Sequence, residues 1–349
     1  MPQQQTLFLE KARRRDGSAA RIFELMVENV ADIENLHRPV LLQETLGLLG
    51  VDRGGQFVDA TLGLGGHTEA ILKSVATTSV LGIDQDPEAL SLANSRLSGF
   101  GSRFTAIEGN FAEVKELVRR AGWTDTEGIL ADLGVSSLQL DSESRGFSFR
   151  YDAPLDMRMA GEKGGETVAD LLATIDESDL ADIIYSFGEE RASRRIAKWI
   201  IERRDRGEPI KTTFELAELV RRAVHRKPKD KIDPATRTFQ ALRIAVNREL
   251  DVLRSFITDA VEILKTNGVL AIITFHSLED RIVKQAFQRL SGRCQCPPRI
   301  PQCVCGAEKL VEILTRKPIV AGETENQNNP RARSAKLRAC RKLEASRSH

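Results

Sequence analysis

Short apolar runs alternate with segments of helical periodicity along most of this chain, and this alternation constrains the fold more than any other feature. The runs end at turn residues, as expected for parallel strands that are buried on both faces. Such runs occupy residues 57–60, 79–83, 104–107, 128–131 and 269–275, and residues 310–315 resemble a late edge strand. The alternation predicts an α/β fold, with a doubly wound parallel sheet that carries helices on both faces.

One long interval interrupts this alternation. Residues 145–240 are rich in helix signals and poor in strand signals, with helical spacing over residues 179–187, 192–204 and 214–224. Thr212-Thr213-Phe214-Glu215 predicts a capping box before the last of these helices. We therefore expect a helical insert domain, which would emerge near the carboxyl ends of the strands, where α/β sheets bind ligands.

The remaining segments complete the expected domain organisation. Residues 1–36 form a polar extension, residues 37–144 and 241–325 form the core domain around the insert, and residues 326–349 form a polar, basic and mobile tail. The N-terminus lacks the apolar region of a secretory signal, and no apolar run approaches the ~20 residues that span a bilayer. We expect a cytoplasmic protein with no membrane association.

Two helix starts of the core domain carry recognisable capping sequences. Asp86 precedes Pro87 and Glu88, which predicts an aspartate N-cap with proline at the first helical position. Ser277-Leu278-Glu279-Asp280 predicts a capping box at the start of the helix after the run 269–275.

A glycine-rich loop follows the first predicted strand. The sequence VDATLGLGGHT places Gly63, Gly65 and Gly66 between a strand and a helix, where the backbone can approach a ligand closely. A nicotinamide dinucleotide site would require a third glycine where this chain has Thr68, which argues against that cofactor. Asp84, at the end of the second strand, can accept hydrogen bonds from both ribose hydroxyls of an adenosine, so loop and carboxylate together predict an adenosine cofactor.

Asp132 ends the fourth predicted strand, at the expected switch point of the sheet. It is followed by LGVSSLQLD. A carboxylate at this point either caps a helix or faces cofactor and substrate. We favour the second interpretation because Asp132 would lie level with the glycine loop and Asp84.

A series of motifs resembles one known family over residues 37–340. The chain is similar to the bacterial ribosomal RNA small subunit methyltransferase H family, also called MraW, through motifs that occur in the same order: HRPVLL (37–42), DATLGLGGHT (59–68), GIDQDP (82–87), GNF (109–111), DLGVSSLQLD (132–141), RGFSFR (145–150), PLDMRM (154–159), RTFQALRIAVN (237–247), FHSLEDRIVK (275–284) and NPRARSAKLR (329–338).

The resemblance implies an activity and a set of cofactor contacts. The family transfers a methyl group from S-adenosyl-L-methionine to the exocyclic amino nitrogen of a cytidine in the decoding centre of small-subunit ribosomal RNA, on a Rossmann-like class I methyltransferase sheet. The positions that match its cofactor contacts are Gly65, Gly66, His67, Asp84, Phe111, Asp132 and Gln139. These fit the residues: the loop can hold the methionine part and Phe111 can pack against adenine, whereas we expect His67 to act as a polar loop residue and not as a base.

The exocyclic nitrogen of cytosine is a poor nucleophile, so the site must hold it in line with the methyl group. Hydrogen-bond acceptors for its two N–H groups would favour this state. Amine methyltransferases often carry Pro-Pro-aromatic after the acidic residue at this point, but here Leu133-Gly134-Val135-Ser136 follow Asp132. Asp132 is the catalytic candidate, and it and the backbone carbonyls after it are the expected acceptors. A stacking ring would come from Arg145–Tyr151 if that segment is not simply buried.

The chain has a net charge of only +1, so a nucleic-acid surface must come from local clusters. Three clusters predict a phosphate-binding surface for the ribosomal RNA. We expect this RNA to be bound within an assembled small subunit, with naked RNA as the alternative, and the sequence leaves the oligomeric state open, a homodimer included. A noncatalytic RNA-binding or assembly protein with the same fold is the alternative function. The clusters are Arg191, Arg194, Arg195, Lys198, Arg203 and Arg204; Arg221, Arg222, Arg226, Lys227, Lys229 and Lys231; and Arg331, Arg333, Lys336, Arg338, Arg341 and Lys342.

Four of the five cysteines lie close together in the sequence, which indicates a reducing compartment and not a disulfide framework. Cys294, Cys296, Cys303 and Cys305 form two Cys-x-Cys pairs around a proline-containing loop. This arrangement predicts a four-thiolate structural zinc site, with unmetallated thiols as the alternative.

Overall fold

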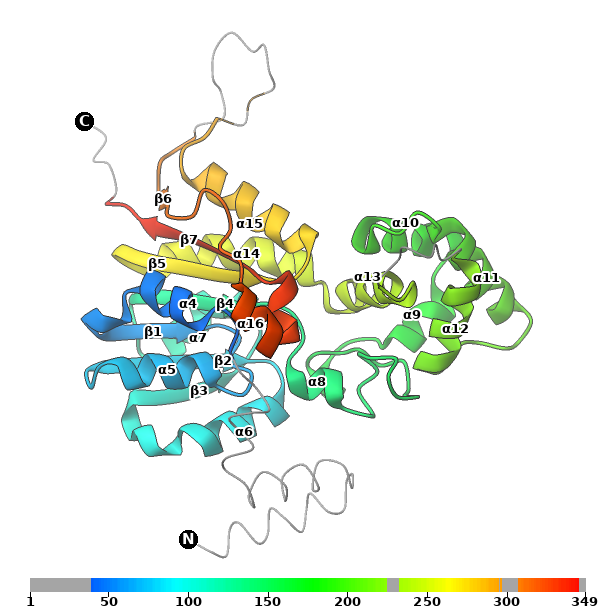
Figure 1. The fold of residues 1–349 in the computed structure, drawn as a ribbon, viewed down its shortest axis with the longest axis horizontal. Helices are drawn as coiled ribbons and strands as arrows, with labels where there is room; N and C mark the ends of the chain where they lie inside the picture. The colour runs from blue at the N-terminus through cyan, green and yellow to red at the C-terminus, as the bar shows by residue number, and fades with distance from the viewer. Residues whose placement is uncertain (1–38, 225–231, 295, 297–306, 345–349) are drawn as a thin grey trace, which may run out of the picture. The chain divides into compact units, whose positions relative to one another are not determined.

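The computed structural model describes residues 39–224, 232–294, 296 and 307–344 (Figure 1). These residues form two compact units. One contains residues 137–158 and 165–246, and the other contains residues 39–136, 159–164 and the part from Asn247 onward. The predicted extension 1–36 lies outside the described residues, and the boundaries predicted for the core and the insert stay a prediction.

The second unit is built on a seven-stranded sheet with the order β3-β2-β1-β4-β5-β7-β6. Neighbouring strands from β3 to β5 are parallel, and β7 is antiparallel to both of its neighbours. The order reverses between β1 and β4, which places the switch point of the sheet there. The strands are β1 Gly55–Asp59, β2 Thr78–Asp84, β3 Phe104–Glu108, β4 Thr126–Asp132, β5 Leu264–Thr274, β6 Val311–Ile313 and β7 Lys336–Lys342.

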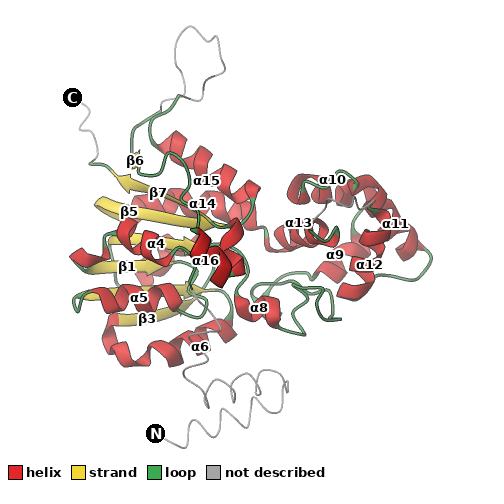
Figure 2. Ribbon diagram, in the orientation of Figure 1, coloured by secondary structure: helices red, strands yellow, loops and turns green. Residues whose placement is uncertain are grey.

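Helices cover both faces of this sheet, as predicted for a doubly wound fold (Figure 2). One face buries a large apolar cluster, to which Phe57, Leu130 and Ile273 contribute from the strands and Leu49, Ile71 and Leu97 from the helices. The alternate strand residues point to the other face, because successive side chains of a strand point to opposite sides. The helices of this unit are α4 Leu42–Leu49, α5 Gly66–Ser74, α6 Pro87–Leu97, α7 Val114–Arg120, α14 Glu249–Ile263, α15 Ser277–Leu290 and α16 Glu323–Asn328.

The cap of α6 is confirmed and the cap of α15 differs from its prediction. The Asp86 side chain accepts a hydrogen bond from the Glu88 N–H, with proline at the start of α6. At α15 the capping box is formed by His276 and Glu279, one residue earlier than predicted, because the His276 imidazole accepts from the Glu279 N–H while the Glu279 carboxylate reaches back.

The prediction of a mobile tail from Asn326 onward is wrong for the residues described up to position 344. Here the chain forms the end of α16, a short 3-10 helix and β7, which lies inside the sheet between β5 and β6. Its charges gave the appearance of a tail, but several of them have partners. The Arg338 guanidinium donates to the Asp280 carboxylate at 2.6 Å, and Leu337 and Ala339 are fully buried.

The other unit is helical over the residues that the structure describes. The capping box at Thr212 and Glu215 is present at the start of α12, and the amphipathic helices bury residues such as Leu180, Ile196 and Leu216. No helix in the described ranges of the chain is long and apolar enough to cross a membrane. The helices are α8 Ser137–Asp141, α9 Val168–Thr174, α10 Glu177–Gly188, α11 Ser193–Asp205, α12 Thr213–Ala223 and α13 Ala235–Asn247.

Candidate active site

Three carboxylates end three neighbouring strands on either side of the switch point. Asp59 is the last residue of β1, Asp84 of β2 and Asp132 of β4. Because these strands are parallel, their carboxyl ends meet at one edge of the sheet. The sheet therefore brings Asp84 and Asp132 to the same edge as the glycine loop, and it adds Asp59, which the sequence analysis did not select.

The glycine loop between β1 and α5 uses its glycines in two ways. Gly63 has a φ of 50° and open space beside its Cα, since a Cβ there would find its nearest neighbour, the Thr61 carbonyl oxygen, at 4.0 Å. Gly65 has a φ of 76°, and a Cβ there would lie 2.8 Å from the Leu97 side chain on α6. The loop thus packs closely at Gly65 and leaves its backbone accessible at Gly63.

The Asp84 carboxylate is tied to the loop by backbone hydrogen bonds. Oδ2 accepts from the Gly63 N–H at 2.7 Å, and Oδ1 accepts from the Asp86 N–H at 2.9 Å. These bonds fix the orientation of the carboxylate. Each carboxylate oxygen has a second lone pair, so Asp84 can still accept two further hydrogen bonds from a diol.

Asp59 and Thr68 form a buried pair at the base of the loop. The Thr68 hydroxyl donates to Asp59 Oδ2 at 2.7 Å, and both side chains are buried. Thr68 occupies the third glycine position of the dinucleotide fingerprint, and its hydroxyl anchors the start of α5 to the end of β1. The residue that argued against a dinucleotide therefore has a structural role of its own.

Asp132 lies against His67 and the loop after β1. The Thr61 hydroxyl accepts from the Asp132 N–H at 2.6 Å, and the His67 Nδ1 lies 3.7 Å from Asp132 Oδ2. The other ring nitrogen of His67, Nε2, is 3.1 Å from the Val40 carbonyl oxygen. Asp132 Oδ1 is buried and has no hydrogen-bond partner among the described residues. The site thus holds one carboxylate oxygen available for a ligand.

Burial dominates the electrostatics of all three carboxylates. It raises the pKa of Asp59 and of Asp84 to about 6, although hydrogen bonds to each carboxylate oppose the shift. The pKa of Asp132 rises to about 8, because burial acts together with repulsion from Asp59 and Glu279, which the positive charge of Arg331 only partly offsets. Asp132 is therefore the carboxyl group of this edge that most resists ionisation.

This shift predicts a pH-dependent cost for the folded state. A carboxyl group with a raised pKa binds its proton more tightly in the folded than in the unfolded chain, so the stability that it contributes is lost as pH rises between the usual value of 3.8 and about 8. Asp132→Asn keeps the shape of the neutral acid. We expect the melting temperature of the variant, measured relative to that of the wild type, to rise with pH over this window. A difference that stays constant with pH would contradict the shift.

Phe111 and Gln139 occupy different parts of the structure. Phe111 begins a 3-10 turn after β3 and packs edge-to-face on Phe256, with ring centroids 5.2 Å apart. Gln139 is buried on α8, in the helical unit. The cofactor contacts predicted for these two residues, and for Gly65, Gly66 and His67, stay predictions.

The aromatic segment 145–151 is mostly packed within the helical unit. Phe147 is buried, and the Phe149 ring lies 4.9 Å from the Phe239 ring and beneath the Arg221 guanidinium. Tyr151 is 42% exposed, so within this segment it is the aromatic side chain that can still stack on a base. The stacking role predicted for the segment stays a prediction, and Tyr151 is its most exposed aromatic side chain.

The basic clusters of the helical unit are partly neutralised. Arg203 pairs with Glu215, and Arg204 donates to the Ile175 carbonyl at the end of α9. Arg191 and Arg194 are exposed at the start of α11. Residues 226–231 of the second cluster lie outside the described residues. The predicted phosphate surface stays a prediction here, with fewer available charges than the sequence suggested.

The cysteine cluster falls largely outside the described part of the chain. Cys294 is exposed and Cys296 is half-buried, while Cys303 and Cys305 lie outside the described residues. We expect the four thiolates to bind one zinc ion, which elemental analysis of protein purified without chelator would measure. Less than about a tenth of an equivalent, with all four thiols open to titration, would contradict the zinc site.

His276, Glu279 and Arg331 are neighbours of this edge that the sequence did not predict. His276 lies two residues after the end of β5, and its Nε2 is 3.1 Å from Glu279 Oε1. The charges of Glu279 and Arg331 both shift the pKa of Asp132. These residues lie in the motifs FHSLEDRIVK and NPRARSAKLR, but nothing in the two motifs indicated that they would lie near the end of β4. Predicting that they lie close together would have required the order of the strands in the sheet.

The strand order, the antiparallel β7 and the glycine loop at the switch point define a class I methyltransferase with a Rossmann-like sheet. The chain belongs to the MraW methylase family, whose model matches residues 34–343. It is 48% identical over 311 residues to the ribosomal RNA small subunit methyltransferase H of Carboxydothermus hydrogenoformans, which covers 89% of this chain and 99% of that protein. The protein of the same name from Geobacter sulfurreducens is 48% identical over 309 residues, or 88% of this chain and 99% of that one.

Solved structures add only a distant similarity. An rRNA methylase from Streptococcus thermophilus aligns with 88% of this chain and 98% of its own, at a TM-score of 0.40 and 12% sequence identity. A similarity at this level does not bear on the substrate. The family membership rests on the sequence relationship.

Proposed function

We propose that this protein transfers a methyl group from S-adenosyl-L-methionine to the exocyclic nitrogen N4 of a cytidine in the decoding centre of small-subunit ribosomal RNA. The observation that carries this proposal is the buried Asp132 carboxylate, which offers an unpartnered oxygen beside the glycine loop at the switch point. Family membership supports the reaction class, and the names of the relatives support the small-subunit substrate.

The residues present fit the cofactor. The open backbone at Gly63 can accept the close approach of a ligand, and the Asp84 carboxylate has lone pairs left for the two ribose hydroxyls. Gly65, Gly66 and His67 would hold the methionine part, and Phe111 would pack against the adenine. The cofactor supplies an electrophilic methyl group on a positively charged sulfur.

Asp132 would act on the amine that receives the methyl group. An ionised carboxylate accepts a hydrogen bond from an amine N–H, which favours the pyramidal nitrogen that attacks. Burial keeps water from competing for Asp132 Oδ1. Because its pKa lies well above the usual range, Asp132 can also take up the proton that the methylated amine loses.

We infer that the substrate is the ribosomal RNA within an assembled small subunit, and that the reaction takes place in the cytoplasm. The relatives are named for the small subunit, which supports a small-subunit substrate. A comparison of methyl transfer to naked small-subunit RNA and to isolated subunits would test this inference directly.

The decisive experiment combines binding and product mapping. Calorimetric titration should show binding of S-adenosylhomocysteine and no binding of a nicotinamide dinucleotide. Labelled methyl should then appear on one cytidine of small subunits taken from cells that lack the protein. Cofactor binding without any transfer would favour the noncatalytic alternative, and transfer to a different nucleotide would overturn the proposed substrate.

A further inference from the structure

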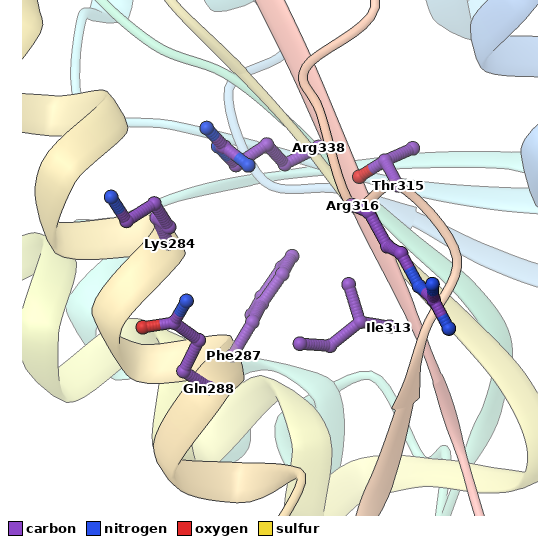
Figure 3. A pocket seen from close by; sticks show the side chains of 7 residues that line it. All are labelled: Lys284, Phe287, Gln288, Ile313, Thr315, Arg316 and Arg338. Atoms are coloured by element: carbon purple, nitrogen blue, oxygen red, sulfur yellow. The ribbon is translucent and has the colours of Figure 1, made fainter. Parts of the chain in front are cut away.

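A small basic pocket, lined by none of the residues of the candidate active site, lies between α15 and the chain around β6. It has a volume of about 130 Å³ and is lined from three elements (Figure 3). Lys284, Phe287 and Gln288 come from α15, and Arg338 comes from β7. The segment at and after β6 supplies Ile313, Thr315 and Arg316.

The charged residues that line this pocket are all basic. Arg338 is only 5% exposed, and its guanidinium donates to the Asp280 carboxylate at 2.6 Å and 3.3 Å, which neutralises its charge and fixes its place in the wall. Lys284 and Arg316 are exposed, and neither has an ion pair or hydrogen bond with any residue that the structure describes. Since no acidic residue lines the pocket, it presents two uncompensated cations.

The two cations stand on opposite sides of an apolar floor. In Figure 3 the Phe287 ring lies between Lys284 on one side and Arg316 on the other, beside Ile313. Phe287 is 1% exposed, so its ring belongs to the packed core. Cations at the rim and a small apolar floor suit a phosphate group that carries a ribose or base edge with it.

We propose that this pocket binds a phosphate of the ribosomal RNA substrate and so anchors the RNA outside the reaction edge. The inference rests on the proposed function, because it takes RNA as the ligand. RNA binding needs cations that are not already paired. The net charge of the chain is only +1, and several basic residues of the helical unit pair with acids, so the unpaired cations of this pocket are suited to contact RNA. Unpaired cations around a preformed pocket are what a phosphate contact requires.

The test removes the two free cations and leaves the walls intact. Lys284→Ala combined with Arg316→Ala should weaken binding to small-subunit RNA by about tenfold at moderate salt, and should lower the slope of log affinity against log salt by about 1.5 to 2. Arg119→Ala combined with Arg120→Ala, at the end of α7, is the matched control. It removes the same net charge from exposed, unpaired positions outside the pocket.

The possible outcomes separate this inference from the proposed function. A pocket variant that loses RNA affinity and salt slope, but binds cofactor and transfers methyl normally at saturating RNA, supports the anchor. Equal losses in the pocket and control variants would show a general charge effect and overturn it, as would unchanged RNA binding in both. If the pocket variant loses binding of inorganic phosphate, followed by phosphorus NMR, while RNA affinity stays unchanged, the ligand is a free anion and the RNA anchor is wrong. Absent methyl transfer by the wild type would instead count against the proposed function.

Discussion

Asp132→Asn is expected to slow methyl transfer by about 100-fold at saturating cofactor and RNA, a loss typical of removing one preorganised group that stabilises a transition state. The amide keeps the size of the carboxyl group and one acceptor oxygen, but it cannot ionise, so it never provides the negative charge that Asp132 places beside His67 once it loses its proton near pH 8. The effect should therefore appear in the single-turnover rate more than in RNA affinity. The matched control is Asp125→Asn, because Asp125 directly precedes the opposite end of the same strand.

The pH profile distinguishes an acceptor from a residue that only positions the cofactor. If the ionised carboxylate is required, the wild-type rate should rise as pH increases toward about 8, since that is where Asp132 loses its proton. The variant should show no such rise. A normal saturated rate in the variant, with only weaker cofactor binding, would make Asp132 a binding residue and leave the acceptor role to other groups.

Local sequence signals were sufficient for most of the sheet. Each of the predicted strands is present in the structure. A short, continuous apolar run is stable as a strand when both faces of the sheet are covered, so such runs are a strong strand signal. The late candidate at 310–315 is confirmed as the short edge strand β6. The family resemblance and the fold class are confirmed as well.

Pairing partners far apart in the sequence account for what was missed. The basic residues of β7, such as Lys336 and Arg338, led to the prediction of a tail. Their charges are compensated by Asp280 on α15, which is distant in the sequence. The shift of the α15 cap to His276 has a similar cause. The His276 imidazole can accept a backbone hydrogen bond as a serine hydroxyl does, but serine is the more common residue at helix N-caps, and this preference led to the prediction of Ser277.

The candidate site was predictable in its individual residues and not in its couplings. Asp84 and Asp132 could be selected because each ends an apolar run. The support that Thr68 gives to Asp59, and the contact of His67 with both Val40 and Asp132, depend on how three strands and α5 meet. The raised pKa of Asp132 follows from that meeting and has no counterpart in the local sequence.

Asp84→Ala is expected to weaken cofactor binding by about 10- to 150-fold, the equivalent of roughly 1.5–3 kcal/mol for lost hydrogen bonds to a charged acceptor. The carboxylate is held by the Gly63 and Asp86 N–H groups, so its lone pairs are already directed before a ligand arrives. Truncation removes both the acceptors and this support for the loop.

Calorimetric titration with S-adenosylhomocysteine measures the loss, and Asp52→Ala, at an exposed aspartate before β1, is the matched control. Loop disorder alone could also weaken binding, so Asp84→Asn belongs in the same experiment. The amide retains one acceptor for a backbone N–H while it loses the charge. An intermediate affinity for Asp84→Asn, with an unchanged melting temperature, would assign the effect to the ribose hydroxyls. Wild-type affinity in a folded Asp84→Ala protein would remove Asp84 from the cofactor site, and the ribose would then have to be held from another strand end.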